Sequence, residues 1–325
     1  MKKQIIALTI SASLSFASYA DLNAVVSALE VDDVKVAEEA YTTLTADEKD
    51  SIQGQILNGR ILLKKDETED AFDYFEALRD SNTEHVDVNY YLGLSAVIMA
   101  QKASIFSKLG YAEDFLEAME KTIELKPDHT EALNTLIGFH LAAPGIAGGD
   151  TDKALIYANQ LKATDPEQGF VQLSNVYRKT DQADLAETTL KQGLNEFPES
   201  SSLYFTRANA YIKDEIWDKA RGDLNLAIKY AKNDDEKSSA LYQQGKTSAE
   251  SGEEIELGIN ALTQAIPLAD QNYKPWIEYR LAQLYIHNNN LSKAKDAISS
   301  INIGEDDDLK SKVKKLKKKL KKLMS

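Results

Sequence analysis

The chain of 325 residues contains no cysteine and only four histidines. Without cysteine, no disulfide can form and no lipid can be attached through a thiol, so packing alone must stabilise the fold. The histidines are His85, His129, His140 and His287, and none has a second ligand at a metal-binding spacing. No pairing of a nucleophile with a base stands out either. We therefore predict no metal, no cofactor and no enzymatic activity, and we expect His140 to serve packing.

Long apolar runs are absent too, with one exception at the N-terminus. There, Lys2 and Lys3 precede an apolar run over residues 5–17, which leads to a small-x-small sequence at residues 18–20. A positive start, an apolar run too short to span a membrane and a small-residue cleavage site are typical of a secretory signal peptide. We predict that residues 1–20 are a cleaved Sec-type signal and that the protein is exported to a bacterial periplasm.

Positive charge is scarce in the body of the chain and concentrated at its end. The chain has 52 acidic and 38 basic side chains, a net charge of −14, yet residues 309–325 hold nine lysines and no acid. A body this acidic does not attract nucleic acid or anionic lipid by its general field. We expect no nucleic acid partner, and only the C-terminal segment could bind a polyanion.

A helix-pair pattern is plainest in residues 201–234. Apolar and small side chains recur there at helical spacing on two segments separated by a polar break, at Tyr204, Arg207, Ala208 and Tyr211 and then at Ala220, Leu224, Ala227 and Ile228. Close crossing of two helices leaves no room for a long side chain at the contact, which Ala208 and Ala220 satisfy. Residues 167–200 and 275–303 repeat the pattern, and a fixed period of about 34 residues is the signature of a helical solenoid.

The repeated positions resemble those of the tetratricopeptide repeat (TPR). The resemblance implies an all-α, right-handed superhelical solenoid of about seven antiparallel helix pairs. The predicted parts are the signal at 1–20, the solenoid at 21–303 with repeats near 52–85, 86–129, 130–166, 167–200, 201–234, 238–271 and 275–303, and a Lys-rich amphipathic helix at 304–325.

Three local features refine this organisation. A capping box formed by Thr45 and Glu48 predicts one helix running on to Leu63. The second repeat has about ten extra residues, which predicts a first helix lengthened to Leu109 and a turn at Gly110. The third repeat carries an insertion, residues 143–150, in which Pro144 would end one helix and Asp150 would cap the next. Its Pro-Gly-x-x-Gly-Gly pattern resembles that of a group of exported bacterial TPR proteins.

The glycines of the insertion do not form a phosphate-binding loop. Such a loop needs a lysine just after its glycines, whereas Asp150 and Asp152 stand there and would repel a phosphate.

The resemblance also implies a groove lined by the first helix of each repeat. In TPR proteins the residues at repeat positions 2, 5, 9, 12 and 13 face the bound partner. The candidates here are aromatic, amide and cationic residues: Tyr90, Asn175, Arg178, Lys179, Phe205, Asn209, Lys213, Tyr242 and Tyr279. Such side chains could hold a peptide. Alternatively, the aromatic rings pack between repeats.

The Lys-rich segment allows three interpretations. Leucine and valine recur by fours and threes, at Leu309, Val313, Leu316, Leu320 and Leu323. The stripe could cap the last repeat, with the lysines solvated or facing the acidic body. It could lie on anionic lipid or another polyanion, with contacts from Lys310, Lys314, Lys317, Lys318 and Lys321. It could also form a short self-association seam.

From these features we predict an exported, non-catalytic TPR adaptor that binds a protein or peptide partner in its groove. An alternative is an envelope-associated protein that docks on a polyanion through the Lys-rich helix while the solenoid recruits a partner. A third, weaker alternative is a non-catalytic subunit of an envelope enzyme or transport complex.

Overall fold

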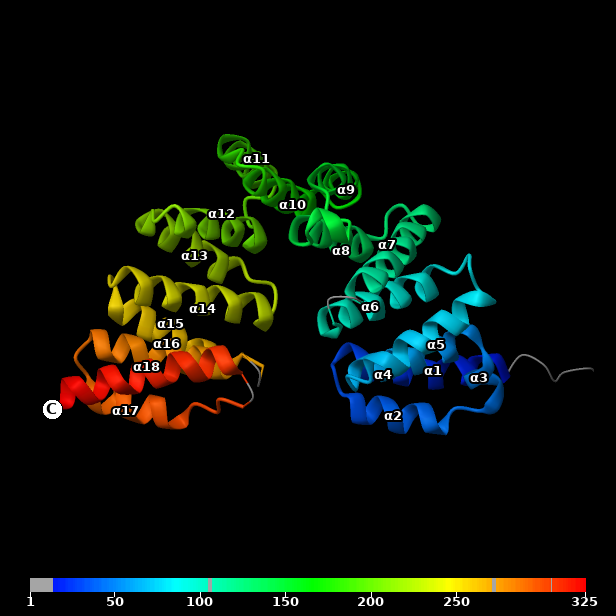
Figure 1. Ribbon diagram of the computed structural model, residues 1–325, viewed down its shortest axis with the longest axis horizontal. Helices are drawn as coiled ribbons and strands as arrows, with labels where there is room; N and C mark the ends of the chain where they lie inside the picture. The colour runs from blue at the N-terminus through cyan, green and yellow to red at the C-terminus, as the bar shows by residue number, and fades with distance from the viewer. Residues whose placement is uncertain (1–13, 105–106, 271–272, 305) are drawn as a thin grey trace, which may run out of the picture. The chain divides into compact units, whose positions relative to one another are not determined.

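A computed structural model describes residues 14–104, 107–270, 273–304 and 306–325 (Figure 1). These residues form eighteen α-helices, one short 3-10 helix and no strand. The all-α fold class predicted from the sequence is confirmed. No helix in the described ranges is long and apolar enough to cross a membrane. Most of the predicted signal peptide, residues 1–13, lies outside these ranges.

The helices fall into two compact units that divide after Thr164. The first unit contains α1 (Leu14–Glu30), α2 (Val34–Thr43), α3 (Ala46–Asp50), α4 (Ile52–Lys64), α5 (Thr68–Asp80), α6 (Val86–Lys102), α7 (Lys108–Leu125), α8 (Thr130–Ala142), η1 (Gly145–Ala147) and α9 (Thr151–Thr164). Successive helices pack as pairs, α1 with α2, α4 with α5, α6 with α7 and α8 with α9. Short connections make the two helices of a pair antiparallel.

The second unit repeats this architecture. It contains α10 (Pro166–Lys179), α11 (Ala183–Glu196), α12 (Ser201–Lys213), α13 (Trp217–Tyr230), α14 (Asp234–Ser251), α15 (Ile255–Ala265), α16 (Lys274–His287), α17 (Leu291–Ser300) and α18 (Asp307–Met324). The pairs are α10 with α11, α12 with α13, α14 with α15 and α16 with α17, and α18 packs on the last pair.

Small residues sit where the helices of a pair cross. Ala208 and Ala220 are fully buried at the position predicted for them. A Cβ atom on Gly59 would lie 2.3 Å from the ring of Phe75, and one on Gly245 would lie 2.2 Å from Leu262 Cγ. These distances are far below van der Waals contact, so the large side chain of one helix occupies the space that glycine leaves on the other.

Two helix boundaries differ from the prediction. The Thr45–Glu48 capping box is present, but α3 ends at Asp50 because Ser51 adopts an extended backbone and caps α4 by accepting the N–H of Gly54 (3.1 Å). The prediction that the first helix of the second repeat is lengthened to Leu109 was also wrong. α6 ends at Lys102, and Gly110 lies inside α7 rather than in a turn.

The last turn of α6 contacts the preceding repeat. Lys102 Nζ donates to Asp66 Oδ1 (2.6 Å) and to Thr68 Oγ1 (2.9 Å), and Ala103 then leaves the helical conformation. The last turn of α6 is therefore held to the start of α5.

The insertion of the third repeat forms a tight, capped turn. Pro144 precedes η1, Gly148 has a φ of 89°, and a Cβ on Gly149 would lie 1.8 Å from the carbonyl oxygen of Ala143. Asp150 accepts the N–H groups of Asp152 and Lys153 at 2.9 and 3.2 Å, as predicted for a cap. These bonds hold the pKa of its carboxyl below the usual value.

His140 is packed against this turn. It is buried beside the ring of Tyr157, with centroids 5.7 Å apart, and its Nδ1 lies 3.0 Å from the carbonyl oxygen of Gly148. A carbonyl only accepts, so Nδ1 carries the proton. Burial lowers the pKa of the ring. His140 is thus a neutral packing residue, as the sequence indicated.

Candidate partner-binding groove

The first helices of the second unit form one layer of neighbours. α10 contacts α12, α12 contacts α14, α14 contacts α16, and α16 contacts α18 (Figure 1). Repeat positions 9 and 13 are four residues apart, so they share one side of each of these helices. We call them the first-helix stripe: Asn175, Lys179, Asn209, Lys213, Lys246, Glu250, Gln283 and His287.

The charge of this stripe differs from that of the chain. Glu250 is its single acid, and its carboxylate lies 3.2 Å from the guanidinium of Arg280. Lys179 and Lys213 are exposed, and neither makes an ion pair with any residue that the structure describes. A protein with a net charge of −14 therefore presents amide and cationic side chains along this line.

The two asparagines are available to a partner. Asn175 is exposed and donates only to Gln172 Oε1 (3.2 Å), one turn earlier in the same helix. Asn209 is half-buried and makes no side-chain hydrogen bond within the described part of the chain. Both amides can therefore pair with a peptide backbone.

Arg178 is occupied within the protein. Its guanidinium donates to both oxygens of Asp214, at 2.8 and 3.2 Å, and so joins α10 to the residue that follows α12. A bidentate arginine–carboxylate pair has fixed geometry. The prediction that Arg178 faces a partner is therefore corrected, because this side chain links two neighbouring repeats.

The aromatic candidates divide by burial. Tyr242 and Tyr279 are only 8% and 7% exposed, so the prediction that their rings contact a partner is corrected. Tyr242 packs edge-on against Tyr273, and Tyr279 packs edge-on against Trp276. Packing between helices is the alternative that the sequence had left open. Phe205 is half-buried on α12.

Tyr90 lies in the first unit and is half-buried. Its ring packs against Tyr91 and His129, with centroid distances of 5.1 and 4.7 Å. Burial, with smaller contributions from Tyr91 and Glu131, raises the pKa of its hydroxyl to about 12. Tyr90 therefore joins α6 to the start of α8.

The Lys-rich helix α18 packs its apolar stripe into the protein. Leu309, Val313, Leu316 and Leu320 are buried in one cluster with residues of α16 and α17, whereas Leu323 is 49% exposed. Asp306 caps the helix by accepting the N–H of Leu309 (2.8 Å). In the described residues, α18 takes the place of the first helix of a further pair, since it contacts both helices of the preceding one.

The lysines of α18 make no ion pair with any other helix that the structure describes. Lys310 and Lys312 pair with Asp307 and Asp308 on the same helix. The other seven make no ion pair with a described residue: Lys314, Lys315, Lys317, Lys318, Lys319, Lys321 and Lys322. The interpretation in which the acidic body neutralises them is corrected, and their charge is left to solvent or a partner.

Sequence reasoning missed a set of residues between α16 and α18. Gln283 and His287 occupy repeat positions 9 and 13 of the last repeat and could have been found from that spacing. Lys312, Lys315 and Lys319 could not, because their place depends on how α18 packs against α16. All five line one surface depression.

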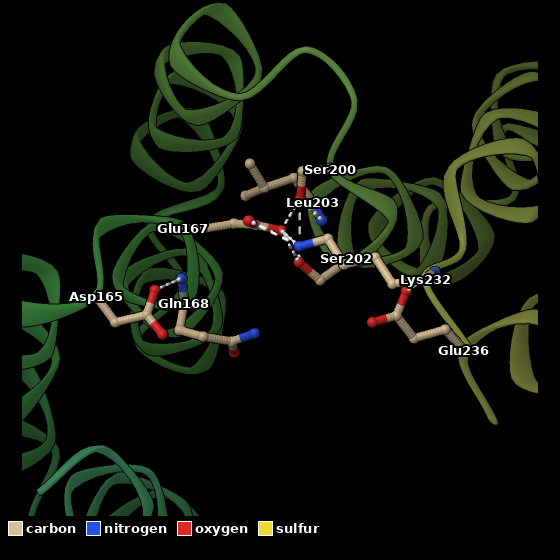
Figure 2. A network of polar contacts seen from close by, with 8 residues as sticks. All are labelled: Asp165, Glu167, Gln168, Ser200, Ser202, Leu203, Lys232 and Glu236. Carbon is tan, nitrogen blue, oxygen red and sulfur yellow. Dashed lines mark hydrogen bonds and ion pairs between the residues drawn. The ribbon is translucent and has the colours of Figure 1, made fainter. Parts of the chain in front are cut away.

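A polar network centred on Glu167 joins two successive repeats (Figure 2). Its Oε1 accepts from Ser200 Oγ (2.7 Å) and Ser202 Oγ (3.2 Å), and Lys232 Nζ lies 3.2 Å from Oε2. Ser200 also caps α12 by accepting the N–H of Leu203 (3.1 Å). One carboxylate of α10 thus holds the start of α12 and the connection from α13 to α14.

Glu167 should make the second unit sensitive to acid. Burial alone would raise the pKa of its carboxyl, but the bonds from Ser200 and Lys232 together hold it below the usual value. A lowered pKa stabilises the fold above the unfolded-state value, about 4.3, and this stabilisation is lost as the pH falls through the folded-state value. Glu167→Gln should therefore cost roughly 1–2 kcal/mol at pH 7 and progressively less below pH ~4.

Urea unfolding followed by tryptophan fluorescence measures this effect. Both tryptophans, Trp217 and Trp276, lie in the second unit, so the signal reports that unit. Glu196→Gln, on the exposed side of α11, is the matched control for the loss of one charge. A Glu167→Gln deficit that stays the same from pH 7 to pH 3 would contradict the role given to the carboxylate.

The histidines of the described ranges do not belong to a cluster of metal-ligand side chains. No group of three or more His, Asp or Glu side chains is placed there to hold a metal ion. His129, which is buried, instead caps α8 by accepting the N–H of Ala132 at Nδ1 (3.3 Å). His129 therefore caps a helix, and His140 packs against Tyr157.

Comparison with known proteins agrees with the fold. Residues 96–129 match the family model of the tetratricopeptide repeat. The structure is similar to a tetratricopeptide repeat protein from Parabacteroides merdae, with 16% identity and a TM-score of 0.53 over 82% of this chain and 99% of that one. It is also similar to yeast Tom70, with 18% identity and a TM-score of 0.51. No curated protein matches the sequence.

The two structural similarities establish the fold class. The match to Tom70 covers 82% of this chain but 63% of the Tom70 chain, so this chain corresponds to part of that protein. At such low identity the comparison shows a helical TPR solenoid and nothing of its partner.

Proposed function

We propose that this protein is a non-catalytic adaptor that holds a protein or peptide partner along the first-helix stripe of its second unit. The observation that carries the proposal is the charge and availability of that stripe. Asn175, Lys179 and Lys213 are exposed and Asn209 is half-buried, and none of the four has a side-chain partner on a neighbouring repeat among the residues that the structure describes. Amides bind a peptide backbone, and exposed lysines attract acidic side chains.

We also propose that the adaptor is exported and acts in the periplasm. The support is the sequence pattern at the N-terminus, where Lys2 and Lys3 precede the apolar run and the small-x-small sequence. An extracytoplasmic protein without cysteine needs another source of stability. The buried polar networks and packed helix crossings of the two units supply it.

The alternative, docking on anionic lipid through α18, has one observation in its favour. Lys314, Lys317, Lys318 and Lys321 are exposed and unpaired among the described residues, as is expected of a polyanion contact. Against it, Leu316 and Leu320 are buried in the protein. An amphipathic helix needs a free apolar face to enter the membrane interface.

Asn175→Ala combined with Asn209→Ala tests the adaptor function. Tagged protein is crosslinked in its native cells, and the adducts of the variant are compared with those of the wild type. The Asn175→Ala/Asn209→Ala variant should lose the dominant adduct, because both amides that pair with the partner's backbone are gone. Gln192→Ala with Asn195→Ala, two exposed amides on α11, is the matched control and should keep it. The proposal fails if a folded Asn175/Asn209 variant keeps the same adduct at wild-type yield.

A further inference from the structure

The depression between α16 and α18 is unusually basic for this protein. It has a volume of about 210 Å³. α16 contributes Tyr279, Gln283 and His287, spaced four residues apart, and α18 contributes Lys312, Lys315 and Lys319. No acidic side chain is among the described residues that line it.

The lysines of this depression differ in how well they are neutralised. Lys312 is paired with Asp308, and its ammonium lies 5.2 Å from the ring centre of Trp276, so it is held in place. Lys315 and Lys319 make no ion pair within the described ranges. Two uncompensated positive charges therefore lie one helical turn apart on the same side of α18.

The floor of the depression is fixed by hydrogen bonds. Gln283 Oε1 accepts from Arg280 Nη1 (3.1 Å), and Gln283 Nε2 donates to the hydroxyl oxygen of Tyr279 (3.1 Å). Since that oxygen already accepts, the hydroxyl hydrogen of Tyr279 remains free to donate to a ligand. Two ammonium groups and one oriented hydroxyl are suitable donors for a carboxylate.

We propose that this depression binds a carboxylate of an acidic segment of the partner protein, and that α18 thereby anchors one end of the chain that lies along the first-helix stripe. The inference rests on the proposed function. α18 continues the layer of α10, α12, α14 and α16, so a bound segment that follows these helices reaches Lys315 and Lys319 next. A volume of about 210 Å³ accommodates a side chain rather than a lipid surface.

Charge complementarity selects this occupant. The stripe carries Lys179, Lys213 and Lys246, and its one acid is already paired with Arg280. The affinity for an acidic partner should therefore fall with rising salt.

His287 provides a local reporter of binding, because burial and the charge of Lys319 lower its pKa. A carboxylate bound beside Lys319 should raise the pKa of His287 towards its ordinary value.

Binding of a fluorescein-labelled acidic octapeptide of Glu and Gly to the full mature chain tests the inference, with a Gln/Gly octapeptide as the reference ligand. Lys315→Gln with Lys319→Gln should weaken binding of the acidic peptide about 10-fold or more. The matched control is Lys314→Gln with Lys318→Gln, the same charge change on exposed residues outside the depression, and it should weaken binding only about twofold. In the wild type, histidine NMR should show the pKa of His287 rising on binding, and His287→Gln assigns the signal.

Three results would overturn the proposal. Equal losses in the two lysine pairs would mean general attraction to α18 rather than a site. An unchanged pKa of His287 at saturation would place the peptide elsewhere. Stronger binding to phosphatidylglycerol vesicles than to the peptide would point to a membrane surface, if the Lys314→Gln/Lys318→Gln variant no longer binds the vesicles. Each result leaves the Asn175/Asn209 crosslinking test standing, so failure of this site is distinguishable from failure of the proposed function.

Discussion

Arg207→Leu should destabilise the second unit by about 3–5 kcal/mol, because it leaves a buried carboxylate without its partner. Arg207 on α12 donates to both oxygens of Asp223 on α13, at 2.6 and 2.7 Å. Asp223 is 5% exposed, so water cannot replace the lost bonds. The hydrogen bonds that Arg207 donates to Asp223 also raise the pKa of the arginine, which stays charged throughout the accessible range.

A double-mutant cycle separates the pair from its surroundings. Arg207→Leu with Asp223→Leu should recover much of the loss, since replacing both members of a buried ion pair by apolar groups is often nearly neutral. The exposed pair Lys191–Glu187 on α11 supplies the control, and Lys191→Leu should change stability by no more than about 0.5 kcal/mol. Urea unfolding monitored at Trp217 and Trp276 gives all the values. An Arg207→Leu variant within about 1 kcal/mol of wild type would show that the buried carboxylate needs no partner.

Leu316→Ala should cost roughly 2–4 kcal/mol, because it opens a cavity at the contact of α18 with α16 and α17. Leu316 is 6% exposed and belongs to the cluster that includes Tyr279, Ile286 and Ile298. The site lies near the end of the chain, where α18 can shift to fill part of the cavity. We therefore expect the loss to fall in the lower part of the usual range for leucine to alanine.

Leu323→Ala is the control in the same helix. Leu323 is 49% exposed, so its removal should change stability by less than about 0.5 kcal/mol. Both variants are compared by urea unfolding at the same pH and salt. If Leu316→Ala and Leu323→Ala had the same small effect, α18 would not be an integral part of the second unit, and its leucines would be free for another surface.

The repeat architecture could be predicted because it depends on local spacing. Small residues at the crossing positions identify it. Gly245 lies against Leu262, and Ala208 and Ala220 are both fully buried. The cap of Asp150 was predictable for the same reason, since it involves residues two and three positions away. Features that lie within one helix or one turn are readable from the sequence.

Contacts between repeats were not readable. α6 ends at Lys102, whose ammonium contacts Asp66 and Thr68 in the preceding repeat, and no local pattern indicates that contact. The buried ring of Tyr242 likewise packs on Tyr273, which precedes the next repeat. An aromatic residue at repeat position 5 can face a partner or a neighbouring helix, and only packing decides between them.

In the candidate site, too, residues set by repeat spacing could be predicted and residues set by contacts between helices could not. Asn175 and Asn209 follow from repeat spacing, whereas the role of Arg178 was missed because Asp214 lies a full repeat away. The basic depression required knowledge of which side of α18 meets α16. Heptad-like spacing of leucines predicted a buried stripe but could not say that Lys315 and Lys319 line the same depression as His287.

Site-specific photocrosslinking along the second unit tests the adaptor function most directly. A photoreactive residue is placed singly at positions 175, 209, 246 and 283 on the first helices, and at the exposed positions 192 and 195 on α11. The adducts formed in the native cells are then identified. We predict one common protein at the four first-helix positions and none at 192 or 195. Adducts of equal yield at all six positions, or only on α11, would contradict binding along the first-helix stripe.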